Sequence, residues 1–317
     1  MADHEQTLGA AGEFAVIAHV NADRTQPPSV LLGPGDDAAV VTAPDGRVAI
    51  STDMLVEGRH FRLDWSAPHD IGRKAIAQNA ADIEAMGGRV SAFVVGFGAP
   101  AGTPLTQARE LSDGLWAEAA RVGAGIVGGD MVASPQWVVS VTVLGDLAGR
   151  APVTRSGARA GDVVALAGRL GASAAGYALL DAGVDEFMPL RRVHLVPEPP
   201  YGEGVRAAEA GAAALTDVSD GLIADARHIA SSSGVDIELS RAALQPDVDA
   251  LSAAAGRLAA DPWQWVLAGG EDHGLLGCFP AGVPDGWRVI GRVCEGSGRV
   301  LVDGVEPAGY SGWESFG

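Results

Sequence analysis

Segments with the two-residue period of strands alternate with segments of helical period along the whole chain. Because both halves mix the two patterns, antiparallel neighbours and crossover connections are both needed, and an α+β fold is expected. The expected strands are 38–41, 48–52, 91–97, 126–127, 137–144, 163–167, 235–239, 275–279 and 287–293. The expected helices are 12–22, 70–86 (with Asp70 as N-cap), 105–122, 173–182, 204–212, 221–232 and 241–255.

A break in this alternation divides the chain. Residues 149–161 are rich in Arg, Gly, Pro and Ser and follow neither period. We therefore expect a domain boundary there, with an N-terminal domain over 1–149 and a C-terminal domain over 150–317. Each half would be a mixed α/β-type domain.

The charge balance restricts the partners. The chain has 40 acidic and 22 basic residues and a net charge of -18, which argues against nucleic acids and anionic membranes as partners. No apolar run reaches the roughly 18 residues of a membrane helix, and the first ten residues lack a signal-peptide pattern. With only Cys278 and Cys294, a disulfide framework is excluded. A cytoplasmic protein is expected.

A single lysine excludes several common nucleotide sites. Lys74 is followed by Ala75, so the Gly-Lys-Ser/Thr of a phosphate-binding P-loop is absent. The zinc-protease and serine-hydrolase signatures H-E-x-x-H and G-x-S-x-G are absent as well. Any phosphate chemistry must therefore use other groups.

Carboxylates recur in short glycine-flanked groups at the ends of elements. Singly, each is ordinary turn or cap chemistry. Together they imply a cation, since clustered carboxylates repel and raise one another's pKa, and oxygen ligands suit Mg²⁺ or Ca²⁺. Flanking glycines let backbone N–H groups approach phosphate oxygens. The groups are 35–37, 51–53, Asp82, 128–130, 217–221 and 269–272.

Four other residues leave two interpretations open. Arg150 and Arg155 are either phosphate ligands or solvated linker residues. His60 follows the acidic group at 51–53 and is either a site residue or a local hydrogen-bonding group. Trp313 lies in an aromatic tail that either docks on the core or forms a wall for a flat or cationic ligand.

The ordered set of motifs resembles the thiamine-monophosphate kinases, whose superfamily includes aminoimidazole-ribonucleotide synthetase and selenophosphate synthetase. Two segments depart from the family pattern: His273-Gly274 replaces a usual Tyr-Glu, which affects the substrate pocket, and NAADIEAMG replaces a sequence closer to NLSDLAAMG. Neither removes an acid. The motifs are GEF (12–14), GPGDDAAV (33–40), STDMLVEGRHF (51–61), KAIAQNAADIEAMG (74–87), GGD (128–130), TRSGARAGD (154–162), DVSDGL (217–222) and GGEDHGLL (269–276).

The resemblance implies an N-terminal domain that binds ATP and several Mg²⁺ ions and pairs into a β-barrel shared by a homodimer. The C-terminal α+β domain would complete the nucleotide and substrate site. Implied metal ligands are Asp37, Ser51, Thr52, Asp53, Asp82, Asp130, Asp217 and Asp220. Implied nucleotide contacts are Gly129, Asp130, Arg155 and Ser219, and implied thiamine phosphate contacts are His60, Glu271 and Trp313. The catalytic set would be Asp53, Asp82, Asp130 and Arg155.

The implied reaction is direct in-line transfer from ATP to thiamine phosphate, giving thiamine diphosphate. An aminoimidazole-type synthetase and a non-enzymatic acidic metal-binding protein remain as alternatives. Selenophosphate synthetase is disfavoured because its N-terminal catalytic Cys or selenocysteine has no counterpart, the first cysteine being Cys278.

Overall fold

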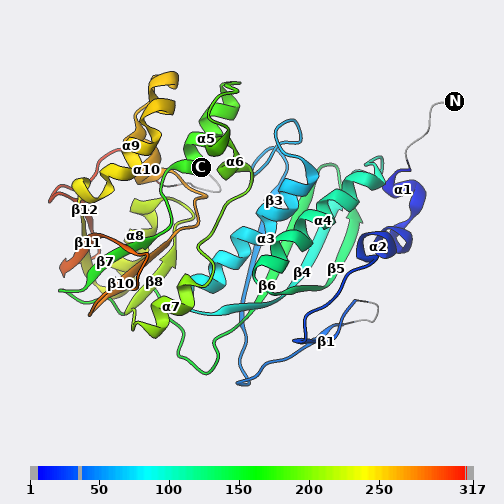
Figure 1. The fold of residues 1–317 in the computed structure, drawn as a ribbon, viewed down its shortest axis with the longest axis horizontal. Coiled ribbons are helices and arrows are strands. Elements are labelled where there is room, and N and C mark those ends of the chain that lie inside the picture. The colour runs from blue at the N-terminus through cyan, green and yellow to red at the C-terminus, as the bar shows by residue number, and fades with distance from the viewer. Residues whose placement is uncertain (1–5, 35–37, 311, 313–317) are drawn as a thin grey trace. The chain divides into compact units, whose positions relative to one another are not determined.

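The computed structural model describes residues 6–34, 38–310 and 312. Asp37 and Trp313 lie outside the described residues. The chain has a mixed α+β fold and divides into two compact units (Figure 1). Unit 1 comprises residues 1–83 and 89–148, and unit 2 comprises 84–88 and 149–317.

Unit 1 is built on a four-stranded sheet with the order β3-β6-β4-β5. Strand β6 pairs antiparallel with β3 and β4, whereas β5 runs parallel to β4. Short strands β1 and β2 form a separate antiparallel pair, so β2 does not pair with the next strand along the chain. The bounds are β1 Val30–Leu32, β2 Val40–Val41, β3 Ala49–Val56, β4 Arg89–Ala99, β5 Gly125–Ala133 and β6 Val138–Asp146.

Two helices, α3 (Pro68–Ala85) and α4 (Leu105–Arg121), cover one face of this sheet (Figure 1). Their axes approach closely because Gly72 and Gly114 lie at the contact. A Cβ at Gly114 would lie 1.9 Å from the carbonyl oxygen of His69, and one at Gly72 would lie 2.2 Å from that of Leu111. Helix α3 begins at Pro68, so Asp70 lies in its first turn and is not its N-cap.

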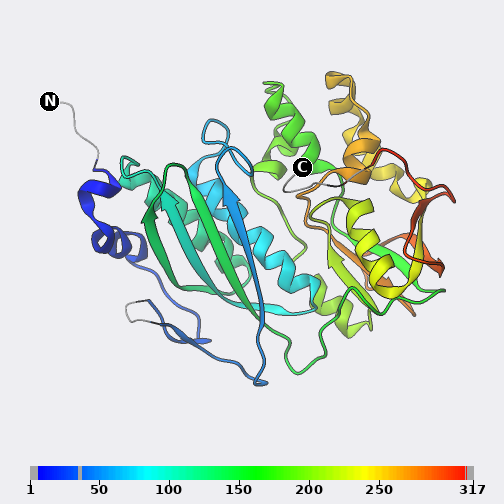
Figure 2. The ribbon, with the colours of Figure 1, turned by 180° about the vertical axis from the view of Figure 1, so that it is seen from behind.

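The opposite face of the sheet is apolar at several exposed positions. Ile50, Met54 and Val132 are 68%, 52% and 58% exposed. Figure 2 shows that no helix of this unit covers the centre of that face, as far as the described residues extend. The sheet therefore presents an uncovered apolar surface within unit 1.

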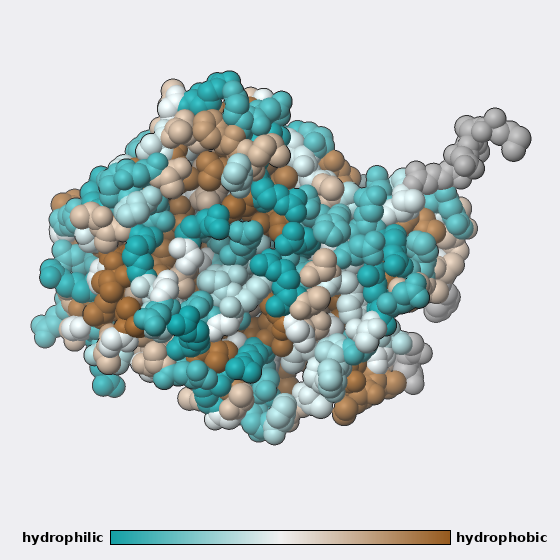
Figure 3. Space-filling model, in the orientation of Figure 1, coloured by the Kyte–Doolittle hydropathy of each residue, from teal (hydrophilic) through white to brown (hydrophobic). Residues whose placement is uncertain are grey.

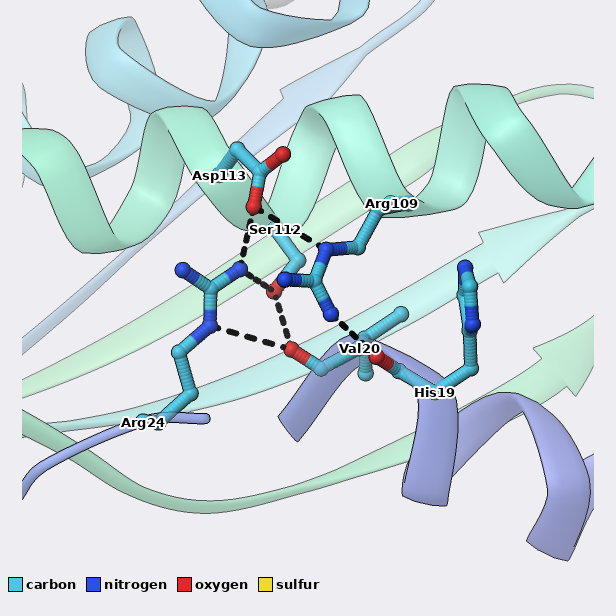
Figure 4. Close-up of polar contacts among 6 residues, drawn as sticks. All are labelled: His19, Val20, Arg24, Arg109, Ser112 and Asp113. Atoms are coloured by element: carbon cyan, nitrogen blue, oxygen red, sulfur yellow. Dashed lines mark hydrogen bonds and ion pairs between the residues drawn. The ribbon is translucent and has the colours of Figure 1, made fainter. Parts of the chain in front are cut away.

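Two short helices precede the sheet, α1 (Leu8–Ala11) and α2 (Glu13–Asn21), and α2 is fixed to α4 by polar contacts (Figure 4). Arg109 donates to the carbonyl of His19, and Ser112 donates to that of Val20 at 3.0 Å. Both carbonyls lie in the last turn of α2, where cationic donors complement the helix dipole. Arg24 also donates to the Val20 carbonyl, at 3.2 Å, and forms an ion pair with Asp113.

Unit 2 contains a six-stranded sheet with the order β12-β9-β11-β7-β10-β8. Only β12 and β9 are parallel among its pairs. Its strands are β7 Val163–Ala167, β8 Ala214–Asp217, β9 Val235–Leu239, β10 Leu275–Phe279, β11 Arg288–Glu295 and β12 Val300–Val302. Its helices are α5 Ala172–Asp181, α6 Met188–Leu195, α7 Glu203–Glu209, α8 Leu222–Ser233, α9 Arg241–Leu258 and α10 Pro262–Ala268.

Both faces of this sheet are covered, as the alternation along β7 demonstrates. Val164 and Leu166 belong to a core formed with α5, α8, α9 and α10, whereas Ala165 and Ala167 belong to a second core that includes residues of α7. Strand β7 is therefore wholly apolar, as is its neighbour β10, whereas its other neighbour, β11, carries charged residues.

The outer surface is mainly polar. On the face drawn in Figure 3, polar residues are spread throughout and apolar residues form separate patches. Among the described residues, no helix is both long and apolar enough to cross a bilayer.

Candidate functional site

Strand β3 and helix α3 bring three of the predicted site residues together in unit 1. Ser51 and Asp53 lie two residues apart on β3 and so face the same side of the sheet. The Ser51 hydroxyl donates to Oδ2 of Asp82 on α3 at 2.6 Å. Asn79, one turn before Asp82 and fully buried, accepts from the backbone amide of Asp53 at 3.0 Å. This oxygen-rich group suits a hard divalent cation.

Thr52 lies between these residues in sequence but faces the other side of the sheet. Its side chain is exposed, and its hydroxyl donates to the carbonyl of Val141 at 2.9 Å. The structure therefore does not bring the Thr52 hydroxyl to Ser51 and Asp82.

Gly129 and Asp130 lie on β5, at the other edge of the same sheet. Asp53 pairs with Val141, which pairs with Val95, which pairs with Gly129. Three strand spacings of about 4.8 Å separate the two edges by about 14 Å. Asp130 follows Gly129 and is in register with Gly96, Ser140 and Met54, so it lies on the opposite face of the sheet from Asp53 and forms a separate acidic position.

The tight pairing of β4 with β5 requires glycine at position 129. A Cβ there would lie 2.0 Å from the carbonyl oxygen of Val95. The following carboxylate, Asp130, is exposed, and its Oδ1 accepts from the amide of Met131 at 2.9 Å. Glycine at position 129 is therefore explained by the close packing of β5 on the backbone of β4.

His60 lies in the loop after β3 and is held by two contacts. Its Nδ1 accepts from the amide of Val56 at 3.0 Å, and its carbonyl accepts from Nζ of Lys74 at 2.9 Å. Lys74 is 2% exposed. The only lysine of the chain thus fixes the loop that carries His60.

In unit 2, two loops carry the other predicted residues and are joined through their backbones. The amide of Glu271 donates to the carbonyl of Ser219 at 2.8 Å, and that of His273 donates to Val218 at 2.9 Å. In return, the Val218 amide donates to the Gly274 carbonyl at 2.7 Å. The acidic loop after β8 and the loop before β10 therefore form one rigid assembly.

Three carboxylates crowd this assembly. Burial and the charge of Asp217 raise the pKa of Asp220. Burial, followed by the charge of Asp217, raises the pKa of Asp225 to about 7. Oδ2 of Asp225 accepts from the amides of Asp220 and Gly221, each at 3.0 Å. One ligand atom each from Asp220, Asp225 and His228 lies within 4.8 Å of the others.

Asp225 was not predicted from the sequence. The available signal was its position in the first turn of α8, directly after the Asp-rich loop, where an acid can accept backbone N–H bonds. Its contacts fix the backbone at Asp220 and Gly221.

Arg150 and Arg155, for which the sequence left two interpretations open, make different contacts. Arg150 donates to the carbonyl of Gly87 at 3.2 Å, so it anchors the 84–88 segment of unit 2. Arg155 is exposed, and its Nε donates to the hydroxyl of Thr216, next to Asp217, at 3.3 Å. Its charge also lowers the pKa of Asp220. Arg155 is thus the cation beside the unit 2 acids.

Glu271 is held by a buried polar pair that sequence analysis did not single out. Nδ1 of His194, on α6, lies 3.3 Å from Oε2 of Glu271 and 3.1 Å from the hydroxyl of Ser173. The next residue, Asp272, accepts from the amides of Gly171 and Ser173 at the start of α5. Burial raises the pKa of Asp272 to about 7.

Known proteins resemble this chain in sequence and in structure. The family model for the N-terminal domain of AIR synthase related proteins matches residues 35–147. The thiamine-monophosphate kinase of Mycobacterium tuberculosis H37Rv is 66% identical over 317 residues, which cover all of this chain and 95% of that protein. That of Corynebacterium glutamicum is 43% identical, covering 98% of this chain and 95% of the relative.

This chain belongs to the thiamine-monophosphate kinase family. A solved structure of the family, AaThiL complexed with AMPPCP and TMP, has a TM-score of 0.78 and 30% identity. It covers 99% of this chain, and this chain covers 100% of it. Membership of the thiamine-monophosphate kinase family confirms the resemblance drawn from the ordered motifs.

Proposed function

We propose that this protein transfers the γ-phosphoryl group of ATP to thiamine phosphate, giving ADP and thiamine diphosphate. The observation that carries the proposal is the 66% identity, over the full chain, to a thiamine-monophosphate kinase. A family structure complexed with AMPPCP and TMP supports the choice of nucleotide and acceptor. The acidic groups of the two units supply the chemistry this transfer needs.

The difficulty of this reaction is electrostatic. The acceptor is a phosphate monoester whose oxygen is already anionic at neutral pH, so a general base is hardly needed. A dianion must instead approach a polyanion. Bound Mg²⁺ ions would neutralise phosphate oxygens and hold both groups in line. The donor set fits such ions, since its carboxylates and hydroxyl are hard oxygen ligands and burial with like charge raises the pKa of Asp220.

The residues of this chain would have separate roles in binding the metal ions and the nucleotide. Asp53, Asp82, Ser51, Thr52 and Asp130, with Asp37 beyond the described residues, would hold Mg²⁺ ions in unit 1. Asp217 and Asp220 would hold Mg²⁺ in unit 2. Gly129, Asp130, Ser219 and Arg155 would contact the nucleotide, with Arg155 also neutralising phosphate charge during transfer. These assignments remain predictions, as do the roles given to residues 1–149 and 150–317.

Thiamine phosphate would be recognised by His60, Glu271 and Trp313. We expect direct transfer without a phosphoenzyme, because the phosphate oxygen of the acceptor is already an anionic nucleophile. The rigid hold of His194 on Glu271 supports a fixed binding position for that carboxylate.

We also propose a homodimer with two-fold symmetry, formed through the uncovered sheet face of unit 1 and closing into a shared barrel. Exposed Ile50 and Met54 on β3 and Val132 on β5 support it, since apolar surface of this kind commonly marks an interface. Pairing would also protect the edge strands. The expected cytoplasmic location remains a prediction.

One experiment tests the activity and its selectivity. The purified protein is incubated with Mg-ATP and, separately, thiamine phosphate, thiamine or an amide substrate of the aminoimidazole-synthetase class, and ADP and products are measured. We expect ADP and thiamine diphosphate in equal amounts with thiamine phosphate only. ADP release driven by the amide substrate would transfer the assignment to the synthetase alternative.

A further inference from the structure

His273 has a backbone conformation that residues with side chains rarely adopt, with φ of 52°. The hydrogen bonds that join residues 273 and 274 to Val218 hold this strained residue against the end of β8. As a result, the imidazole ring points at Asp217, and its Nδ1 lies 3.0 Å from Oδ2 of that carboxylate.

Both partners are removed from solvent, with side chains 7% and 4% exposed for His273 and Asp217. A carboxylate that binds a cation is ionised and can only accept hydrogen bonds, so with Asp217 in that role Nδ1 would carry the proton and donate. One such bond to Oδ2 fixes the plane of the carboxylate and hence the direction of Oδ1. A buried carboxylate that could rotate freely would not hold Oδ1 in a fixed direction.

We propose that His273 is the positioning residue for a divalent cation bound through Asp217. The inference rests on the proposed function, which makes Asp217 a Mg²⁺ ligand. Partners that hydrogen-bond a metal ligand orient it and strengthen its binding, and their loss typically weakens metal affinity by 10–100-fold. His273 would act through Asp217 and touch neither nucleotide nor acceptor.

The proposed role of His273 changes how the replacement of the family's Tyr-Glu by His273-Gly274 is interpreted. The sequence alone placed the exchange of Tyr-Glu for His-Gly in the substrate pocket. The residue contacts the acid of β8, whereas the neighbouring Glu271 contacts His194. The exchange should therefore tune the response to metal concentration and leave the affinity for thiamine phosphate largely unchanged.

Because φ is positive at His273, its imidazole ring can be removed without adding strain to the backbone. Glycine and asparagine both tolerate the left-handed conformation, so His273→Gly and His273→Asn should fold without added backbone strain. Asparagine places its amide nitrogen the same number of bonds from the backbone as Nδ1 and keeps a donor for Asp217. Asp217→Asn serves as the reference without the ligand charge. Trp287→Phe is a matched loss of another buried ring that donates to a carboxylate in unit 2, that of Glu203.

The test measures Mn²⁺ binding by the electron paramagnetic resonance signal of the free ion, in full-length variants with native circular dichroism. His273→Gly should weaken Mn²⁺ binding by 10–100-fold, towards the value for Asp217→Asn. His273→Asn should recover most of the loss, and Trp287→Phe should leave Mn²⁺ affinity unchanged. The Mg²⁺ concentration for half-maximal turnover should shift in the same order.

Three results would overturn the inference: wild-type Mn²⁺ affinity in His273→Gly, no recovery in His273→Asn, or unchanged affinity in Asp217→Asn. Phosphoryl transfer by the wild-type protein is measured separately with thiamine phosphate. An active wild-type enzyme with any of these three results would refute the role of His273 while leaving the proposed function intact. An inactive wild-type enzyme would refute the proposed function itself.

Discussion

Replacing Asp225 by Asn should remove a pH-dependent loss of stability from the metal-free protein. Burial is the main cause that raises the pKa of Asp225 from 3.8 to about 7. Between those pH values the folded protein keeps a proton on Asp225 that the unfolded chain releases. The free energy of unfolding therefore falls as pH rises through this window, and the loss is complete above pH 7.

The size of the effect follows from the shift. A difference of about 3 pKa units at 1.36 kcal/mol each corresponds to about 4 kcal/mol between pH 4 and pH 8. Asparagine does not ionise, and its carbonyl oxygen can still accept from the amides of Asp220 and Gly221, both 3.0 Å from Oδ2 of Asp225. The stability advantage of Asp225→Asn over wild type should therefore grow by about 4 kcal/mol over this range.

Urea unfolding in the presence of EDTA, from about pH 4 to about pH 8, measures this difference directly. Asp181→Asn, at an exposed position, is the control for loss of one carboxylate and should follow the wild-type curve. Parallel pH profiles for wild type and Asp225→Asn would refute the reasoning, because they would mean that Asp225 ionises alike in the folded and unfolded states.

Further outcomes are expected for five other variants. Asp53→Asn should lower turnover by at least about 10²-fold while circular dichroism stays native, since it removes charge that stabilises phosphoryl transfer; near-wild-type ADP release would contradict its metal role. Gly114→Ala places a Cβ 1.9 Å from a backbone carbonyl oxygen and should cost about 1–3 kcal/mol or more in thermal unfolding. Gly256→Ala, where nothing lies within 4 Å, should be neutral or stabilising. Trp313→Ala should mainly raise the KM for thiamine phosphate, with a cation–π loss of about 0.5–2 kcal/mol, and thiamine itself should be a very poor acceptor; a defect confined to ATP affinity would argue against both. Met54→Asp should convert the expected dimer to a monomer in light scattering, and a wild-type monomer at micromolar concentration would count against the interface.

The sequence predicted best those elements whose pattern of apolar and polar residues is visible within a few consecutive residues. Strands β7, β9 and β10 occupy the expected residues because β7 and β10 are short apolar runs and β9 alternates apolar with acidic residues. Strand β8 and helix α10 were missed, since four and seven residues are too few to establish a period. The strand order within each sheet depends on partners distant in the chain and left no local signal.

The candidate site likewise contains features that the sequence predicted and features that it missed. The two-residue period along β3 already indicates that Thr52 faces away from Ser51 and Asp53, but only the structure gives the contact of Ser51 with Asp82, 31 residues away. Asp225 and His194 were missed because their importance lies in what they hold, namely the backbone at Asp220 and the carboxylate of Glu271.

The burial of Lys74 has a consequence for chemical labelling. No other side chain in this sequence carries an ε-amine, and this one is 2% exposed and bonded to the carbonyl of His60. An amine-reactive reagent can acylate it only when the junction between β3 and α3 opens. The rate of acylation at this one position therefore measures local opening beside His60, and ligands that order this loop should slow it.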